Sequence, residues 1–372
     1  MKRLSTGATL VCVLGLSIQA FAGNRDRTGQ AGATELNVNP WAQSSGLFYQ
    51  NTSFVKGLEA MKCNIAGLAF VDKLEVGVAH SQYLSGTGVT VNNLGIAQKL
   101  GSVGVLGLNV MSMGFGDITV TDFNNPEGNG STFKPQFFNI QLGFAKEFSN
   151  AIHAGLAVTY VTEQIADARA SGAAFEAGVQ YNTGKRDNFH LGITLRNVGT
   201  NMKFSGAGFS ISSEAPDNEN YQLNRQTPTQ PYQMPTYLAI GAAYDIYLDE
   251  GRLKPNQDVP YHRLTLLGNF TSNSFLNDYL GGGMEYGFKE MLILRGAYRW
   301  ERDITGDEPS SMYTGWSFGG TIQKSFKNGS RLGVDYSYRP TQRPANGVHV
   351  FALKYTTASK KTKKEMADSG NN

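Results

Sequence analysis

The sequence has no long hydrophobic run after its first 22 residues, and it has almost no cysteine. A membrane-spanning helix needs roughly 20 consecutive apolar residues, so the missing run argues against a helical membrane protein. The two cysteines are Cys12 and Cys63. Cys12 lies in the N-terminal apolar segment, and removal of that segment leaves Cys63 without a partner. The mature chain is therefore expected to hold together without disulfides.

Motifs for metal binding and catalysis are also missing. The five histidines, His80, His153, His190, His262 and His349, form no His-x₃-His pair, and no Cys-x₂-Cys occurs. A G-x-S-x-G elbow, a P-loop and a dinucleotide fingerprint are absent too. The sequence therefore predicts no metal site, no cofactor, no catalytic residue and no enzyme. A lipid-modifying enzyme with Ser and His on adjacent strands remains an alternative to the expectation that His153 and His190 are polar, lumen-facing residues.

An excess of charge of one sign is lacking as well. The formal net charge of the 372-residue chain is +3, so the chain as a whole lacks the excess of positive charge typical of nucleic-acid binding. Glycine and aromatic residues are plentiful, with 44 Gly, 17 Tyr and 21 Phe. Such a composition without a long apolar run is typical of either a large soluble β-protein or an outer-membrane β-barrel.

Residues 1–22 have the features of a secretory signal peptide. A basic start is followed by the apolar stretch 8–18 and by the cleavage pattern Ala20-Phe21-Ala22. A lipoprotein signal is the alternative, but no small residue precedes Cys12 and that cysteine falls early. The protein is therefore expected to be exported.

Fourteen runs after the N-terminal region have the length of tilted, bilayer-spanning strands, about 8–12 residues. They are 75–83, 90–99, 103–112, 137–147, 152–162, 173–181, 188–197, 236–247, 261–270, 279–287, 291–300, 315–325, 331–338 and 348–356. The clearest alternation is in the run 291–300, where Leu292 and Leu294 share one face while Arg295 and Arg299 share the other. Period two describes a half-buried strand, and a soluble sandwich would show the same pattern.

The lengths of the connections favour a membrane barrel over a sandwich. Every second connection is long, including 113–136, 163–172 and 198–235, whereas most of the others are tight turns. Short periplasmic turns and long outer loops are typical of outer-membrane barrels. The short connection 84–89 and the long connection 248–260 are exceptions. An even number of strands places both chain ends in the periplasm.

These patterns predict an all-β fold, an antiparallel transmembrane barrel of about 14 strands in the outer membrane. The segment Ala31–Ala69 is compact, rich in small residues and broken by Pro40, so we expect it to fold into the lumen as a plug. The predicted organisation is a signal peptide at 1–22, a plug or hatch at 23–72, the barrel at 73–357 and a basic periplasmic tail at 358–372.

Three further features have more than one interpretation. The connection 198–235 is too long for a bare connector, so it is either a disordered outer loop or a binding loop. The tail 358–372 is either a solvated segment near anionic headgroups or a docking site for a periplasmic partner. Four residues on polar strand faces are expected to form a lumen charge network that holds the plug, with an anion path as the alternative. They are Arg295, Arg299, Arg331 and Asp335.

Residues 32–40, Gly-Ala-Thr-Glu-Leu-Asn-Val-Asn-Pro, and residues 63–69, Cys-Asn-Ile-Ala-Gly-Leu-Ala, stand out within the plug segment. They resemble the PorV/PorQ family of Bacteroidetes outer-membrane proteins, which is related to the FadL-type transporters. That family carries an Asn-Pro-Ala-Gly-Leu-Ala type motif, and here Ile65 stands where the proline usually does. The similarity extends through 111–118, 204–208 and 335–338. The plug motif marked by this resemblance comprises Asn39, Pro40, Trp41, Asn64, Ala66, Gly67 and Leu68.

The resemblance implies a fourteen-stranded, FadL-like barrel with an N-terminal hatch that works in or beside the type IX secretion system. Its implied partners are a translocon barrel and secreted cargo proteins, besides outer-membrane lipid. A non-enzymatic accessory of type IX protein secretion is therefore the function we expect. A FadL-like transporter that binds a hydrophobic ligand is the first alternative, and the lipid-modifying enzyme is the second. The first plug motif differs from that of PorV itself, which also allows a paralogue with another client.

Overall fold

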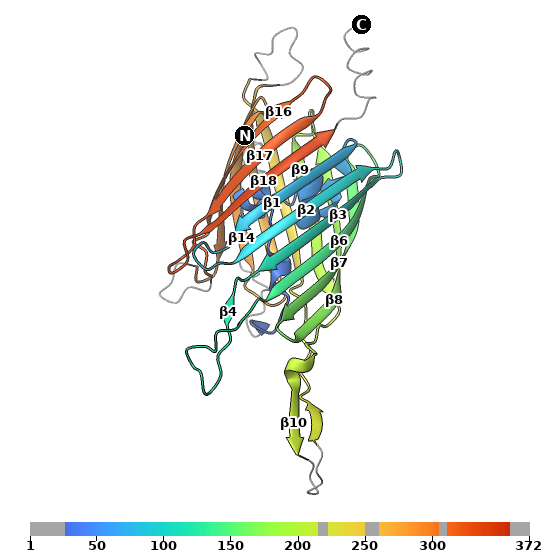
Figure 1. The fold of residues 1–372 in the computed structure, drawn as a ribbon. Coiled ribbons are helices and arrows are strands. Elements are labelled where there is room, and N and C mark those ends of the chain that lie inside the picture. The colour runs from blue at the N-terminus through green and yellow to red at the C-terminus, as the bar shows by residue number, and fades with distance from the viewer. Residues whose placement is uncertain (1–26, 215–221, 250–259, 305–310, 358–372) are drawn as a thin grey trace, which may run out of the picture.

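The structure is a computed structural model that describes residues 27–214, 222–249, 260–304 and 311–357. The described residues form a closed barrel of fourteen antiparallel strands, in which strands adjacent in sequence pair and β1 closes the barrel against β18 (Figure 1). Closure leaves no strand edge that lipid would have to satisfy. The predicted all-β barrel and its number of strands are confirmed.

Each predicted run overlaps one barrel strand. The barrel strands are β1 (Leu74–Gln82), β2 (Thr90–Lys99), β3 (Val105–Gly114), β6 (Gln136–Glu147), β7 (Ile152–Ile165), β8 (Ala168–Thr183), β9 (Phe189–Gly199), β12 (Tyr237–Tyr247), β13 (His262–Asn273), β14 (Tyr279–Phe288), β15 (Leu292–Glu301), β16 (Trp316–Ser325), β17 (Arg331–Arg339) and β18 (Val348–Thr357). Two small hairpins lie outside the barrel wall, β4 (Ile118–Thr119) with β5 (Thr132–Phe133) and β10 (Ser210–Glu214) with β11 (Gln222–Gln226).

The alternation seen in the sequence separates the two faces of the wall. On β15, Leu292 and Leu294 are exposed on the outside, whereas Arg295 and Ala297 are buried on the lumen side. The other strands repeat this arrangement, which gives the barrel an apolar exterior. An apolar band outside and polar groups inside are the arrangement that a bilayer requires of a barrel.

The two ends of the barrel differ. One end carries most of the tight turns, and the other carries the β4–β5 and β10–β11 hairpins (Figure 1). By the outer-membrane pattern, the hairpin end is the outer end. The prediction of a long connection at 163–172 is wrong. Strands β7 and β8 stay paired up to Ile165 and Ala168, which leaves only a two-residue turn. The predicted loop 198–235 instead contains the projecting β10–β11 hairpin.

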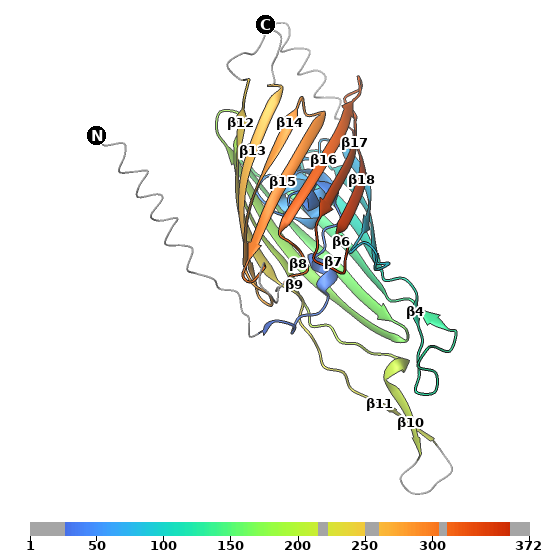
Figure 2. The same cartoon turned by 90° about the vertical axis from the view of Figure 1, so that its left-hand side faces the viewer.

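The N-terminal segment fills the lumen. It contains four short helices, η3 (Thr34–Asn37), α2 (Ala42–Gly46), η4 (Gly57–Lys62) and η5 (Ile65–Phe70), which Figure 2 shows inside the barrel. Within the described ranges, no helix is long and apolar enough to cross a membrane. Because these helices are so short, packing against the wall rather than helix propensity must hold them in place.

The plug segment runs along the whole lumen. Its first described residue, Arg27, lies at the outer end, where its guanidinium donates to Gln233 and stacks on Phe275. Lys73, which directly follows the segment, accepts a main-chain hydrogen bond from Lys99 beside the turn end. The predicted signal peptide, the predicted tail 358–372 and the N-terminus that we expected in the periplasm lie outside the described residues.

Close packing between plug and wall explains part of the glycine content. A Cβ atom at Gly192 of β9 would lie 2.4 Å from the carbonyl oxygen of Thr52, and one at Gly107 of β3 would lie 2.7 Å from the Met61 sulfur. Trp41, Leu58 and Met61 are fully buried in the core between plug and wall. Glycine on the lumen face therefore allows the plug backbone to approach the wall.

Candidate functional site

The first half of the plug motif makes a turn at the start of α2. The Asn39 side chain accepts a hydrogen bond from the Trp41 main-chain N–H at 3.0 Å and donates one to the Lys62 carbonyl at 3.0 Å. Pro40 between them is buried. The Trp41 ring lies against Gly77 and Gly95 on the lumen face of β1 and β2. These residues hold α2 and η4 together and anchor them to the wall.

The second half of the motif attaches η5 to the opposite wall. Asn64 accepts a hydrogen bond from the Ala66 N–H at 3.2 Å, which caps the helix, and donates to the main-chain oxygens of Thr52 and Val179 at 2.9 and 3.1 Å. A Cβ atom on Gly67 would lie 2.0 Å from the Val55 carbonyl oxygen. Ala66, Gly67 and Leu68 are all buried. The motif thus has a structural role in the packing of the plug.

A chain of buried charges links the plug to the wall. Lys354 of β18 forms ion pairs with Glu59 of η4 at 2.7 Å and with Asp335 of β17 at 3.4 Å. Asp335 also accepts a hydrogen bond from the plug residue Gln43 at 3.0 Å. Buried charges are tolerated when they are paired in this way.

The four residues of the expected charge network separate in the structure. Arg295 pairs with Glu285 and donates to Thr321, whose hydroxyl donates to Asp335, so Arg295 and Asp335 share one network. Arg299 lies instead in a chamber nearer the outer end. Arg331 is exposed at the first residue of β17.

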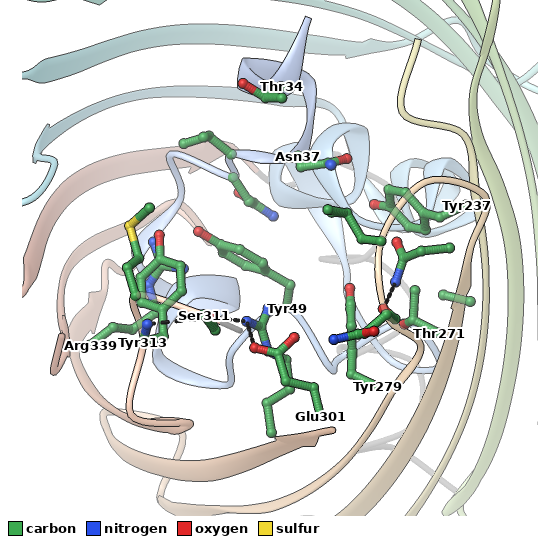
Figure 3. Close-up of a pocket in the computed structure, with 18 of the residues that line it drawn as sticks. Thr34, Asn37, Tyr49, Tyr237, Thr271, Tyr279, Glu301, Ser311, Tyr313 and Arg339 are labelled. Atoms are coloured by element: carbon green, nitrogen blue, oxygen red, sulfur yellow. Dashed lines mark hydrogen bonds and ion pairs between the residues drawn. The ribbon is translucent and has the colours of Figure 1, made fainter. Parts of the chain in front are cut away.

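That chamber is a cavity of about 430 Å³ between the plug and the outer ends of the strands (Figure 3). Its floor includes Tyr49 and Cys63 of the plug. Its wall includes Tyr279 of β14 and Arg339 of β17, and Tyr313 lies on the connection between β15 and β16. A cavity of this volume is within the usual range for small-molecule sites.

The chamber walls are aromatic and positively charged. Five tyrosines line it, namely Tyr49, Tyr83, Tyr237, Tyr279 and Tyr313. The Arg299 guanidinium lies 4.2 Å from the Phe48 ring and 4.8 Å from the Tyr279 ring, and its Nη2 lies 3.4 Å from Glu301. Lys62 also lines the chamber, and burial lowers the pKa of its amine to about 8, so it is mostly charged at pH 7.

Above the chamber, a carboxyl pair joins the plug to an outer connection. Glu35 of η3 is buried close to Glu163 of β7, and Glu163 accepts a hydrogen bond from the Tyr232 hydroxyl. Burial, and secondly the negative charge of Glu163, raise the pKa of Glu35 to about 8. Glu35 is therefore mostly protonated at neutral pH.

The described part of the chain contains no group of side chains arranged for metal binding or nucleophilic catalysis. No three His, Cys, Asp or Glu residues there are grouped so that they could hold a metal ion. Within the described ranges, the hydrogen bonds of the histidine rings join them to Asn, Asp and Tyr rather than to Ser. His153 and His190 are buried on the lumen side, as expected. Burial raises the pKa of Cys63 to about 12, which keeps its thiol protonated.

Among known proteins, the chain resembles several solved structures in its fold. No family model matches the chain, and no curated protein matches it. Among solved structures, the Pseudomonas putida toluene transporter TodX is similar at 12% identity over 87% of this chain and 99% of that chain, with a TM-score of 0.53. The Ralstonia pickettii toluene transporter TbuX is similar at 11% identity over 87% and 99%, and the CymD monoaromatic hydrocarbon channel at 11% over 91% and 99%, both with a TM-score of 0.50.

The barrel is FadL-like. At these identities the likeness concerns the fold alone, and it agrees with the apolar exterior of an outer-membrane barrel. The FadL-like fold that the PorV/PorQ resemblance implied is therefore confirmed.

The chamber was not predictable from the sequence. Arg299 was expected in one network with Arg295, and no sequence motif pointed to Tyr49, Tyr313 or Arg339. One signal was present in the sequence, because Arg299 and Arg339 both occupy polar positions near the outer ends of their strands. Their convergence depends on the register of strands that are not neighbours in the wall.

Proposed function

We propose that the protein is a non-enzymatic outer-membrane transporter that admits small hydrophobic or amphipathic molecules from the outer end. The observation that supports this proposal is the aromatic chamber of about 430 Å³ directly above the plug. Proteins of similar fold are named as toluene transporters and a monoaromatic hydrocarbon channel, which points in the same direction.

Passage beyond the chamber requires the plug to rearrange. Below the chamber, Trp41, Leu58 and Leu68 are each at most 1% exposed between plug and wall. Core packing of this density leaves no continuous path for a solute. The chamber is therefore the entry site in this proposal, and movement of the plug is a later step.

Uptake by cells tests the proposal. Cells that produce the protein should take up toluene or benzyl alcohol faster than cells without it. Ala239 of β12 lines the chamber and is buried, so Ala239→Trp should fill the chamber and abolish the gain. Ala177→Trp adds the same bulk on β8, on the outward face that Ala177 shares with the exposed Phe175 and Val179, and should leave uptake unchanged. Equal uptake by Ala239→Trp and the unaltered protein would argue against a route through the chamber.

The accessory role in type IX secretion is the second candidate. It is supported by the β10–β11 hairpin, which projects beyond the outer end of the barrel with Ile211 60% exposed (Figure 2), and by the resemblance of the plug segment to the PorV/PorQ family. A hairpin that extends away from the wall offers main-chain groups and side chains to another protein.

An affinity pull-down from detergent-solubilised outer membranes tests this second role. Recovery of a large translocon barrel or of exported proteins that share a C-terminal domain would support it. A variant in which a short Gly-Ser turn replaces residues 207–227 should then lose these partners, while a variant shortened at 118–133 serves as the matched control. Recovery of the barrel alone with an apolar ligand would instead favour the transporter.

A further inference from the structure

The Arg339 side chain at the outer end of β17 is buried, with 1% of its surface exposed. Within the described part of the chain it forms no ion pair, and its hydrogen-bond partner is the Tyr313 hydroxyl. Its Nε and Nη2 atoms have no partner in the structure. A buried guanidinium without a carboxylate is costly, because it has lost water without gaining an anion. Arg339 is therefore an unusual group to retain for packing alone.

The free atoms of Arg339 have a specific shape. Nε and Nη2 form one edge of the planar guanidinium, and this edge binds both oxygens of a carboxylate through parallel hydrogen bonds. Arg299 Nε is also buried without a partner, and Arg299 lines the same chamber as Arg339. Both guanidiniums lie over the Phe48 and Tyr313 rings, at 4.2 and 5.6 Å for Arg299 and at 5.4 and 5.0 Å for Arg339. Unsatisfied donors therefore gather at one side of the chamber.

The charge balance of the chamber also favours an anion. Three cationic residues line it, Lys62, Arg299 and Arg339, against one anionic residue, Glu301. Glu301 lies 3.4 Å from Arg299, and no ion pair joins it to Arg339 in the described part of the chain. In a partly desolvated site an excess of positive charge attracts an anion more strongly than it does in water.

The other residues of the chamber wall indicate that the anion carries an aromatic ring. The tyrosine rings provide flat, partly polar surfaces, which suit stacking with another ring. The volume of about 430 Å³ and the closed floor suit a compact molecule rather than a long chain. We propose that the chamber binds small aromatic carboxylates, with the ring among the tyrosines and the carboxylate on the Nε–Nη2 edge of Arg339, which a shift of the side chains that cover it uncovers. This inference rests on the proposed function, in which the chamber is the binding site.

Titration calorimetry on the intact protein in detergent tests the inference. The probes are benzoate, its neutral analogue benzamide, and octanoate as an aliphatic carboxylate. We expect benzoate to bind about tenfold tighter than either, because charge-assisted hydrogen bonds to a buried guanidinium add to the stacking. Arg339→Lys keeps the charge but loses the planar edge, and should remove most of this preference. Arg331→Lys, at the exposed start of the same strand, is the matched control and should keep it.

The outcomes separate this inference from the proposed function. A preference for benzoate that is lost in Arg339→Lys and kept in Arg331→Lys supports the inference. Equal binding of benzoate and benzamide to the unaltered protein overturns it while the transporter proposal stands. Octanoate binding as tight as benzoate binding overturns the aromatic part. If none of the probes binds and the cellular uptake of benzyl alcohol is also absent, both proposals fail. The comparison of probes on the unaltered protein decides the matter even if a variant does not fold.

Discussion

Lys354 of β18 and Glu59 of the plug form a buried ion pair, with 2.7 Å between Nζ and Oε1. Glu59 also accepts hydrogen bonds from the main-chain N–H and the hydroxyl of Ser44, at 2.9 and 3.0 Å. One carboxylate therefore ties together two segments of the plug and the barrel wall. Removing one partner of a buried pair typically costs roughly 3–5 kcal/mol, because the other charge stays buried.

Glu59→Gln is therefore expected to loosen the plug without opening the wall. Lys354 would keep only its longer pair with Asp335. The variant should show frequent open events in planar-bilayer recordings, whereas we expect the intact protein to stay closed. Glu147→Gln, an exposed acid at the end of β6, should behave as the intact protein does. A Glu59→Gln protein that stays as closed as this control would show that the pair does not fasten the plug.

Deletion of Ala31–Ala69 is expected to leave a barrel that inserts but leaks. The wall strands pair with each other through their main chains, so closure does not require the plug. The lumen, however, is filled by this segment. Conductance in planar bilayers is the measurement. A deletion protein that inserts and remains as tight as the intact one would contradict the role of the segment as a plug.

Gly67→Ala is expected to destabilise the plug. The added Cβ atom would lie 2.0 Å from the Val55 carbonyl oxygen, and overpacking of this kind costs roughly 1–3 kcal/mol. Amide hydrogen exchange across residues 55–70 should become faster. Gly268→Ala on β13 is the matched control, because its nearest contact would be 4.0 Å away. Unchanged exchange in Gly67→Ala would mean that the plug relaxes at no cost.

The docking of the outer part of the plug is expected to weaken as the pH rises. The pKa of Glu35 is raised from its ordinary value of 4.5 to about 8 in the folded protein. The folded state therefore binds more protons than the unfolded state between these values, and its stability falls as the pH rises through this window. Protease cleavage near residues 27–37 should be faster at pH 9 than at pH 6.

Glu35→Gln should remove this dependence, since the amide cannot lose a proton. Glu127→Gln, an exposed acid on the connection that carries β4 and β5, is the control and should keep it. Cleavage that is independent of pH in the unaltered protein would argue against a buried, neutral Glu35.

The barrel could be predicted because each of its strands carries its own signal. The two faces of the strand at Leu292–Glu301 differ in polarity residue by residue, and the lengths of the connections assign the two ends. The plug could be proposed from Pro40 and its small neighbours, because this stretch breaks the alternation. The turn at Ala166 was missed, since the small and polar residues around it carry no strand pattern although the main chain stays paired.

The periodic part of the protein follows from the sequence alone, because alternation and connection length are local properties of the chain. The contacts between polar groups depend on the assembled fold. Arg295 and Asp335 join one network, whereas Arg299 and Arg339 face the same chamber beside Tyr313. These contacts depend on barrel closure, on strand register and on the path of the plug through the lumen. None of these is encoded in any single stretch of residues, so the chamber appears only when the whole barrel is assembled.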